Sequence, residues 1–457
     1  MRLPRIMIGA PASRSGKTMV TCGILQAFVN RGLNAASFKC GPDYIDPLFH
    51  SKIIGTKSKN LDTFFSNEET IKYLFGKTAE KADISVMEGV MGYYDGAGGI
   101  STKGSSYELS RITNTPSILV INCKGMSLSI IPLIQGFLKY RNDSNIIGVI
   151  LNQMSKNMYK IIKEQIENEL DIKVLGYVPF VKELVIESRH LGLIMPEEME
   201  DLHIRLNKLA DIFEETVELD MILQMAEKAE ELCYSIPEIP KLTREVNIAV
   251  AKDEAFCFYY QDNLDILQDM GADLIEFSPI HDKELPEHID GILIGGGYPE
   301  LAAEKLSANK SMKKSIRSAL KKGIPCLAEC GGFMYLHEKM QDISGQSYPM
   351  VGSIAGEVYK TDKLNRFGYI NLTANYDQMA AKCGDTIAAH EFHYFDSNSC
   401  GDSFTACKPL RKTKWNCIHG NENMAVGFPH LYYYSNINVP FRFLNRCLDR
   451  KMRNEIR

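Results

Sequence analysis

Residues 5–30 read RIMIGAPASRSGKTMVTCGILQAFVN: a short apolar run, a loop of small residues and a longer apolar pattern. After its first residue, the run at 5–10 is apolar on both faces of an extended chain, which is typical of a strand buried in a parallel sheet. Residues 17–30 have the length of a helix rather than of a strand. A strand, a loop and a helix in this order predict the first unit of a parallel α/β fold.

The same alternation continues along the chain. It predicts strands at 35–39, 84–87, 117–121, 146–151 and 174–178, with helices such as 156–170 between some of them. A helical pattern at 204–233 is followed by YSIPEIPKLTRE at 234–245, which has two prolines and few apolar residues and is typical of a linker. Further strands are expected at 246–251, 274–277, 291–294 and 324–327.

The chain has 457 residues, which is enough for two domains with separate cores. We therefore predict an α/β fold with two domains. The expected divisions are a parallel-sheet domain at 1–235, a linker at 236–245, a second α/β domain at 246–440 and a tail at 441–457.

Composition and charge argue against several classes of protein for this sequence, including nucleic-acid-binding, secreted and membrane-spanning proteins. The net charge is −5, and the 52 Lys and Arg residues are scattered rather than gathered in a basic stripe, so we expect no nucleic-acid partner. The start of the chain becomes polar too soon for a signal peptide, and no apolar run is long enough to span a membrane, so a cytoplasmic location is expected. The 12 Cys residues include no C-x-x-C pair, which indicates reduced thiols rather than a zinc site.

The loop GAPASRSGKT at 9–18 carries the first functional pattern. A glycine-containing loop before a helix presents backbone N–H groups to a phosphate; Lys17 can reach the terminal phosphates, and the Thr18 hydroxyl can bind Mg²⁺. The usual spacing would need glycine at position 11, where this chain has Pro11, and the extra glycine is displaced to Gly9. We interpret the loop as a variant nucleotide site; an ordinary strand–helix turn is the alternative.

Acidic residues come soon after two of the expected strands. Glu88 ends ISVMEG (84–89), and the next segment ends at Asp95. Asp43 and Asp46 lie in FKCGPDYIDPLFH (38–50), and Asp62 lies in LDTFF (61–65). Ligands bind at the carboxyl ends of strands in open α/β sheets, and a carboxylate there can hold Mg²⁺. Solvated acids in plain turns remain the alternative at these positions.

A cysteine occupies a second strand-to-helix junction. LAECGGFMYL (327–336) places Cys330 after a strand and before two glycines, which indicates the sharp turn of a nucleophile elbow. A helix start there would lower the pKa of the thiol. A buried structural cysteine is an equal alternative until two other stretches are considered: GGGYPEL (295–301), whose N–H groups suit an oxyanion hole, and AVGFPHLYYY (425–434), whose His430 could act as a base.

These motifs are similar to those of a known family. GGGYPE, AECGGFMYL and a distant His resemble class I glutamine amidotransferase domains. Joined to GAPASRSGKT, GPDYIDPLFH, LDTFF, VMEGVMGYYDG and HEFHYF (390–395), they resemble the cobyrinate a,c-diamide synthase family over nearly the whole chain. The resemblance implies a phosphate-loop domain like that of dethiobiotin synthetase, fused to a glutamine amidotransferase domain. It also implies amidation of two carboxylates of a corrin precursor in cobalamin biosynthesis, with ATP, glutamine and Mg²⁺.

Roles for the second domain follow from the resemblance. Cys330 is implied as the nucleophile that forms a glutamyl thioester, and His430 as the group that activates it. Gly296 and Gly297 are the expected oxyanion hole. Many class I glutaminases have Glu two residues after this His, where this chain has Tyr432, which leaves open what orients His430.

Roles for the first domain follow in the same way. The implied ATP-binding residues are Ser15, Gly16, Lys17 and Thr18; the metal residues are Thr18, Glu88 and Asp43; the substrate residues are Tyr44, Asp46, Asp62 and Asp95. The division of roles among the four Asp residues stays open. His390 and His393 of HEFHYF are expected to pack or to contact substrate rather than to catalyse.

Other functions remain possible at this stage. The same chemistry could act on nickel sirohydrochlorin or hydrogenobyrinate, or at other carboxylates as in a cobyrate synthase. A different class is an ATPase of the chromosome-partitioning type, which would not depend on glutamine or on Cys330. The expected partner is a small corrinoid, without nucleic acid or membrane, and a homodimer is left open.

Overall fold

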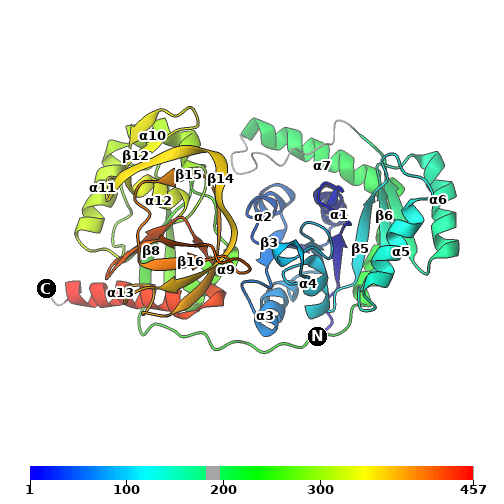
Figure 1. The fold of residues 1–457 in the computed structure, drawn as a ribbon, viewed down its shortest axis with the longest axis horizontal. Helices are drawn as coiled ribbons and strands as arrows, with labels where there is room; N and C mark the ends of the chain where they lie inside the picture. Colours follow the sequence, from blue (N-terminus) through cyan, green and yellow to red (C-terminus); the bar gives the residue numbers. More distant parts are fainter. Residues whose placement is uncertain (182–195, 456–457) are drawn as a thin grey trace. The chain divides into compact units, whose positions relative to one another are not determined.

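The computed structural model describes residues 1–181 and 196–455. The chain divides into two compact units, Met1–Pro237 and Glu238–Arg457 (Figure 1). The division falls inside the segment expected to be a linker, where YSIPEIPKLTRE has too few apolar residues to join either core.

The described part of the first unit is built on a seven-stranded parallel sheet with the order β3-β2-β4-β1-β5-β6-β7. The strands are β1 (Arg5–Gly9), β2 (Ala35–Cys40), β3 (Lys57–Leu61), β4 (Ile84–Glu88), β5 (Ser117–Asn122), β6 (Ile146–Asn152) and β7 (Lys173–Val178). The central strands are buried on both faces, as their apolar runs predict. Every strand predicted in this unit is therefore present.

Helices connect these strands and cover the sheet (Figure 1). They are α1 (Lys17–Asn30), α2 (Ile45–Phe49), α3 (Glu68–Ala79), α4 (Ser106–Ile112), α5 (Ile130–Tyr140), α6 (Lys156–Glu169), α7 (Pro196–Thr216) and α8 (Leu219–Glu227). The single helix predicted at 204–233 is wrong, because α7 and α8 are separated at Val217. The backbone of Val217 pairs with Gly176 of β7, and this tertiary contact overrides the helical pattern.

The second unit contains a six-stranded sheet, in its described residues, with the order β18-β19-β11-β10-β8-β9. These strands are β8 (Val246–Ala251), β9 (Ala272–Phe277), β10 (Gly291–Ile294), β11 (Cys326–Glu329), β18 (His419–Asn421) and β19 (Met424–Gly427), and all pairs except β18–β19 are parallel. Helices α9 (Gln261–Asp269), α10 (Ala303–Ala308), α11 (Lys310–Lys321) and α12 (Gly331–Leu336) connect them. This is the second α/β unit that the sequence predicts.

A further sheet in this unit was not predicted. Its strands are β12 (His337–Gln341), β13 (Ser347–Pro349), β14 (Ile354–Ala374), β15 (Thr386–Ser397), β16 (Phe404–Cys407), β17 (Lys414–Cys417) and β20 (His430–Leu431). The long strand β14 runs through KTDKLNR at 360–366, whose polar residues suggest a loop. Within it, Lys360 and Asn365 pair with β15, and the register between the two strands is irregular there.

The residues expected to form a tail are largely helical. Helix α13 (Asn438–Glu455) packs against β8 and α9, and Phe443, Leu444 and Cys447 on it are fully buried. Residues 456 and 457 of the expected tail lie outside the described residues. The helix carries an apolar stripe at helical spacing, which was the sequence signal for its burial.

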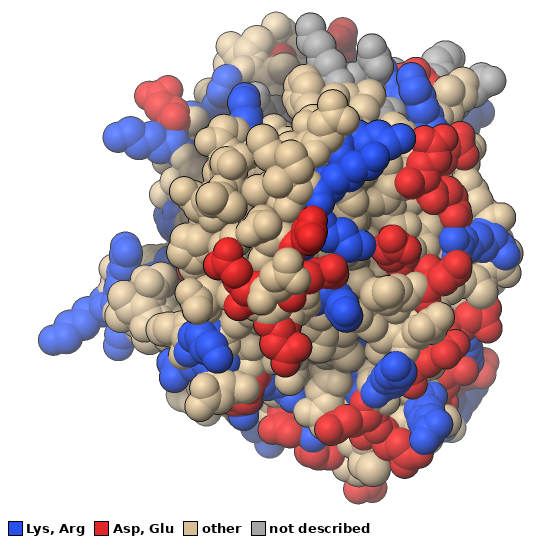
Figure 2. All heavy atoms as spheres, turned by 90° about the vertical axis from the view of Figure 1, so that its right-hand side faces the viewer, with Lys and Arg blue, Asp and Glu red and all other residues tan. Residues whose placement is uncertain are grey.

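The surface gives two further observations. On the face drawn in Figure 2, acidic and basic side chains lie side by side rather than segregated by sign. No helix within residues 1–181 and 196–455 is both long enough and apolar enough to cross a bilayer.

The packing of α7 on α1 generates a prediction about stability. Phe213 of α7 is fully buried in the core that includes α1. Phe213→Ala should lower the free energy of unfolding by about 3–5 kcal/mol, because it leaves a cavity under the helix that follows the phosphate loop. Urea unfolding measures the change. The matched control is Ile204→Ala on the same helix: Ile204 is 63% exposed, and the expected change is within about 0.5 kcal/mol. Equal losses in the two variants would contradict the assignment of Phe213 to this core.

Candidate active site

The phosphate loop joins β1 to α1, and its end depends on a glycine. Gly16 precedes α1 with φ at 95°, and a Cβ there would lie 2.2 Å from Nδ2 of Asn152. Asn152, at the end of β6, donates a hydrogen bond to the Ser15 carbonyl at 2.9 Å, which anchors the loop. No side chain caps the start of α1. Its first N–H groups are therefore oriented as in an anion site.

Lys17 and Ser15 point into the loop itself. The Lys17 ammonium donates to the carbonyls of Met91 at 2.5 Å and Ala12 at 3.4 Å, and the Ser15 hydroxyl donates to the Ala12 carbonyl at 2.9 Å. Burial, reinforced by the charge of Lys39, lowers the pKa of Lys17 to about 8. Because both acceptors are neutral carbonyls, the ammonium can exchange them for phosphate oxygens without breaking an ion pair.

Thr18 lies against the acid at the end of the neighbouring strand. Strand β1 pairs with β4 so that Ile8 is opposite Glu88, and the Thr18 hydroxyl donates to Glu88 Oε1 at 2.6 Å. Burial raises the pKa of Glu88 to about 7. A hydroxyl, one carboxylate, phosphates and water form a donor set that Mg²⁺ accepts. Within residues 1–181 and 196–455, no group of three or more His, Cys, Asp or Glu is arranged to hold a metal.

Lys39 is a functional residue that the sequence analysis missed. Its ammonium lies 2.5 Å from Asp46 Oδ2 and 2.9 Å from Glu88 Oε1, and all three side chains are buried. Burial opposes the charge of Lys39, but the two carboxylates outweigh it and raise its pKa well above the ordinary value. Burial likewise opposes the charge of Asp46, and Lys39 outweighs it, so the pKa of Asp46 is lowered. The sequence signal that could have identified Lys39 was a lysine within an otherwise apolar strand.

His50 also contacts Glu88, at the carboxylate oxygen that Lys39 does not contact. Its Nε2 lies 3.5 Å from Glu88 Oε2, and the ring is fully buried. Burial lowers the pKa of His50 to about 4, so the ring is neutral near pH 7. The structure therefore gathers Lys39, Asp46, His50 and Thr18 around Glu88.

The other acids predicted in this unit stabilise turns. Asp43 Oδ1 accepts the N–H of Ile45 at 2.8 Å, just before Tyr44 leads into α2. Asp62 Oδ1 accepts the N–H of Phe64 at 2.8 Å after β3, and Asp95 Oδ2 accepts the N–H of Gly92 at 3.0 Å in the loop that Lys17 contacts. Tyr44 and Asp62 are buried. These three Asp residues shape loops beside the phosphate site, whereas Asp46 reaches the cluster directly.

In the second unit, Cys330 sits in the strained turn that its motif predicts. It follows β11 directly and has φ 48° and ψ −105°, a conformation unusual for a residue with a side chain. A Cβ on Gly332 would lie 2.2 Å from the Ile294 carbonyl oxygen, so only glycine lets α12 turn back this close to β10. The predicted elbow is confirmed in its backbone geometry.

The expectation of a lowered thiol pKa is wrong. Burial raises the pKa of Cys330 above its ordinary value, and the nearby Glu300 adds to the effect. Helix α12 has only six residues, so its dipole does not offset burial. The thiol therefore needs a base to lose its proton.

His430 lies against the glycine turn, and the glycine turn lies against the residue that follows Cys330. His390 of β15 pairs with His430 of β20, and a Cβ on Gly296 would lie 2.5 Å from His430 Cε1. The N of Gly297 would lie 3.1 Å from a Cβ on Gly331, the residue after the cysteine. Burial lowers the pKa of His430 to about 3, and the charge of His393 adds to this, so the ring is a neutral acceptor near pH 7.

The HEFHYF segment forms part of β15 and has two different faces. His393 stacks on Phe428 with ring centroids 4.1 Å apart, and Glu391 accepts from Trp415 Nε1 at 3.3 Å and lies 3.3 Å from His393 Nε2. Phe392 and Tyr394 point outward and are exposed. His393 is thus a packed residue of this unit, as expected.

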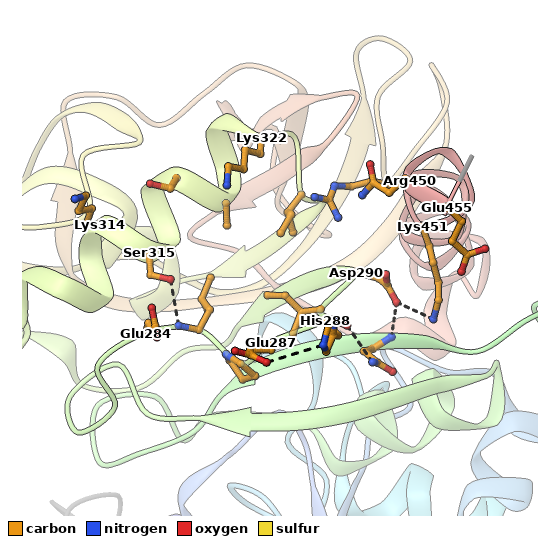
Figure 3. Close-up of a pocket in the computed structure, with 18 of the residues that line it drawn as sticks. Glu284, Glu287, His288, Asp290, Lys314, Ser315, Lys322, Arg450, Lys451 and Glu455 are labelled. Carbon is orange, nitrogen blue, oxygen red and sulfur yellow. Dashed lines mark hydrogen bonds and ion pairs between the residues drawn. The ribbon is translucent and has the colours of Figure 1, made fainter. Parts of the chain in front are cut away.

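A cavity of about 900 Å³ lies elsewhere in the second unit (Figure 3). Asn247, Asp290 and Ile324 line it near the amino ends of β8, β10 and β11, whereas Cys330 follows the carboxyl end of β11. Both basic and acidic side chains line it, and Lys451 of α13 pairs with Asp290 at 3.2 Å. It is therefore separate from the thiol site.

Comparison with known proteins relates both units to described families. Residues 6–193 match the family described as CobQ/CobB/MinD/ParA nucleotide binding domain. Residues 247–427 match the CobB/CobQ-like glutamine amidotransferase domain. The two matches follow the order in which the two sites occur along the chain.

Curated relatives cover almost the whole length. A protein of Caldanaerobacter subterraneus subsp. tengcongensis named cobyrinate a,c-diamide synthase is 40% identical over 444 residues, covering 96% of this chain and 98% of the relative. Two further relatives have the same name. The protein of Listeria innocua serovar 6a is 40% identical, covering 94% of this chain and 97% of the relative. The protein of Priestia megaterium is 36% identical, covering 97% of each chain.

The contact between Gly296 and His430 generates a prediction. Gly296→Ala should displace the imidazole, because the added Cβ would lie 2.5 Å from its Cε1, and should slow glutamine hydrolysis by about 100-fold. A coupled glutamate assay measures the rate. Gly136→Ala, on α5 with no atom within 4 Å of the added Cβ, is the control. A Gly296→Ala variant as fast as this control would show that His430 is not the base.

Proposed function

The chain belongs to the cobyrinate a,c-diamide synthase family, and we propose that it amidates the a and c carboxylates of cobyrinate through an acyl phosphate and a cysteine thioester. Its activity is glutamine-dependent amidation in cobalamin biosynthesis. The observation that carries the proposal is the presence on one chain of a phosphate loop beside Glu88 and of a strained Cys330 followed by a glycine that lies against the turn contacting His430. An ATPase of the partitioning type does not account for the amidotransferase match at 247–427.

The reaction explains why one chain carries both sites. A carboxylate does not react with ammonia near pH 7, because its oxygen is a poor leaving group. Transfer of a phosphoryl group makes that oxygen leave as phosphate. Ammonia released by the protein as the free base can attack the acyl carbon before it is protonated in water. A thiol glutaminase and a phosphate loop therefore serve one reaction.

In the first unit, the N–H groups at the start of α1 and the Lys17 ammonium bind the ATP phosphates. Thr18, Glu88 and Asp43 are the proposed residues for Mg²⁺, which neutralises phosphate charge when bound. A substrate carboxylate oxygen attacks the γ-phosphorus, and the bond from that phosphorus to the β,γ-bridging oxygen breaks to release ADP. Tyr44, Asp46, Asp62 and Asp95 are the proposed substrate residues. The positive charge of Lys39 is held by Asp46 and Glu88 where the phosphoryl group would pass.

In the second unit, His430 takes the Cys330 proton as the sulfur attacks the amide carbon of glutamine. The resulting oxyanion is stabilised by N–H groups of Gly296 and Gly297. The C–N bond then breaks, and the proton on His430 passes to the leaving nitrogen to give ammonia. Water, deprotonated by His430, hydrolyses the thioester to glutamate. The neutral state of His430 suits this base role.

Replacing the thiol tests the proposal. Cys330→Ser should lose glutamine-driven amidation by at least about 1000-fold, while added ammonia should still support it, because the first unit keeps its phosphate site. Cobyrinate, hydrogenobyrinate and nickel sirohydrochlorin are each supplied with ATP and Mg²⁺, and product mass reports the substrate and the number of amides. We expect two amides on cobyrinate. Full glutamine-driven turnover by Cys330→Ser would refute the thioester.

Replacing the phosphate-loop lysine should give the opposite pattern. Lys17→Met removes the ammonium that faces the phosphates, so amidation should fall by about 100-fold or more with either nitrogen source. Glutamine hydrolysis at Cys330 should continue, since that site is in the other unit. The two rates are measured separately by product mass and by glutamate release. Equal amidation by Lys17→Met and the unmodified protein would exclude this loop as the ATP site.

A further inference from the structure

We propose that Glu329, the residue before the nucleophile, is the positioning residue that orients His430. This rests on the proposed glutaminase function and deepens it. The residue that takes this role in many class I glutaminases would be at position 432, where this chain has Tyr432. The structure supplies a carboxylate from a different strand instead.

The fold directs Glu329 toward the histidine. Glu329 is the last residue of β11, and it pairs with Gly427 of β19, three residues before His430. Its Oε2 lies 3.8 Å from His430 Nδ1, and its carboxylate accepts a hydrogen bond from the backbone N–H of Leu431. The contact to Leu431 holds the acid against β20, the strand that carries His430. Both contacts are to β20, and one of them is to the ring nitrogen itself.

A neutral imidazole carries its proton on one ring nitrogen. The nitrogen that faces the acid therefore decides whether the other ring nitrogen of His430 can accept a proton. With Nδ1 facing Glu329, a proton on Nδ1 leaves the Nε2 lone pair for the thiol. This is the tautomer that a base at His430 requires. The 3.8 Å separation is longer than a hydrogen bond, and such contacts often shorten once substrate is bound.

Tyr432 is engaged elsewhere. Its hydroxyl donates to Asp262 Oδ2 on α9 at 3.1 Å, and its ring packs edge-on against Tyr260 with centroids 5.2 Å apart. Both partners lie in the segment at 260–269. Position 432 therefore joins β20 to α9 instead of contacting the imidazole through an acid.

Other charged groups also surround the pair. From β15, His390, Glu391 and His393 face His430, and Tyr259 and Tyr433 lie near Glu329. Glu391 is the competing acid, but it already accepts from Trp415 and pairs with His393. Glu329, by contrast, has its Oε2 atom 3.8 Å from Nδ1 of His430.

The protons of the pair can be followed through the reaction. Burial raises the pKa of Glu329 to about 8 and lowers that of His430 to about 3, so at neutral pH the acid keeps its proton and the ring carries its single N–H. When the acid loses its proton, the carboxylate favours the tautomer with the N–H on Nδ1, which leaves the Nε2 lone pair free. When Nε2 then accepts the thiol proton, the imidazolium forms beside a negative charge. The rising limb of activity with pH therefore reports the deprotonation of this pair.

The test compares Glu329→Gln with the unmodified full-length protein. Glutamine hydrolysis should lose about 100-fold in kcat, while KM changes less than about threefold, because Glu329 acts through His430 and does not bind glutamine. The pH range over which kcat rises should move to lower pH, because the carboxyl group of Glu329 no longer has to lose its proton. Amidation driven by added ammonia should stay unchanged. A merely structural role would lower kcat without moving the limb.

Control variants separate the three candidates. Tyr432→Phe and Glu391→Gln should both keep the rising limb of the unmodified protein. Glu329→Asp retains the charge one methylene further from the ring, so its limb should stay near the original position while kcat falls less than in Glu329→Gln. If Glu329→Gln does not fold, as shown by loss of ammonia-driven amidation, the kcat of Glu329→Asp for glutamine hydrolysis decides: a fall that Tyr432→Phe does not show supports the role of Glu329, and an unchanged kcat overturns it.

The outcomes separate this inference from the proposed function. The role of Glu329 would be overturned if Glu329→Gln kept the kcat and the rising pH limb of the unmodified protein. It would also be overturned if the limb moved in Tyr432→Phe or Glu391→Gln instead. Neither outcome would contradict the proposed glutaminase activity. Absence of glutamine hydrolysis in the unmodified protein would overturn the proposed function itself.

Discussion

Hydrogen bonding between parallel strands brings strand ends to the same edge of a sheet, and both sites depend on this register. Pairing of Ile8 with Glu88 puts the acid of β4 beside the phosphate loop that follows β1. Pairing of Ile294 with Ala328 puts the glycine turn after β10 beside Cys330 after β11. In each unit the reacting groups are thus supplied by loops, while the sheet sets their separation.

Burial gives the two sites opposite electrostatic characters. In the first unit, Lys39 keeps its charge because Asp46 and Glu88 surround it, so the cluster holds a buried ammonium. In the second unit, burial raises the pKa of Cys330 and lowers that of His430, so thiol and ring rest in neutral forms. In the proposed reaction, charge appears there only as the proton moves from sulfur to nitrogen, which suits release of nitrogen as uncharged ammonia.

The sequence predicts much of this arrangement, and its failures have physical causes. Most strands of the two α/β sheets and the elbow at Cys330 follow from apolar periodicity and from glycines at turns, whereas β3, β18 and β19 were not predicted. The sheet that contains β14 and β15 was missed, because the polar stretch at 360–366 has no strand pattern of its own. Lys39 was missed for a similar reason, since a buried lysine is recognised only through the acids around it. The helical pattern at 204–233 failed where Val217 pairs with Gly176.

By itself the sequence determined the order of the elements, the glycine positions at the two turns and the choice of Cys330 and His430, because these depend on neighbours within a few residues along the chain. The tertiary structure alone decided which side chains meet: Lys39 with Glu88, and Glu329 with His430. It also decided the protonation states, since the pKa of a thiol or an imidazole depends on how much water and charge surround it. Those surroundings come from segments far apart in the chain, which no local pattern specifies.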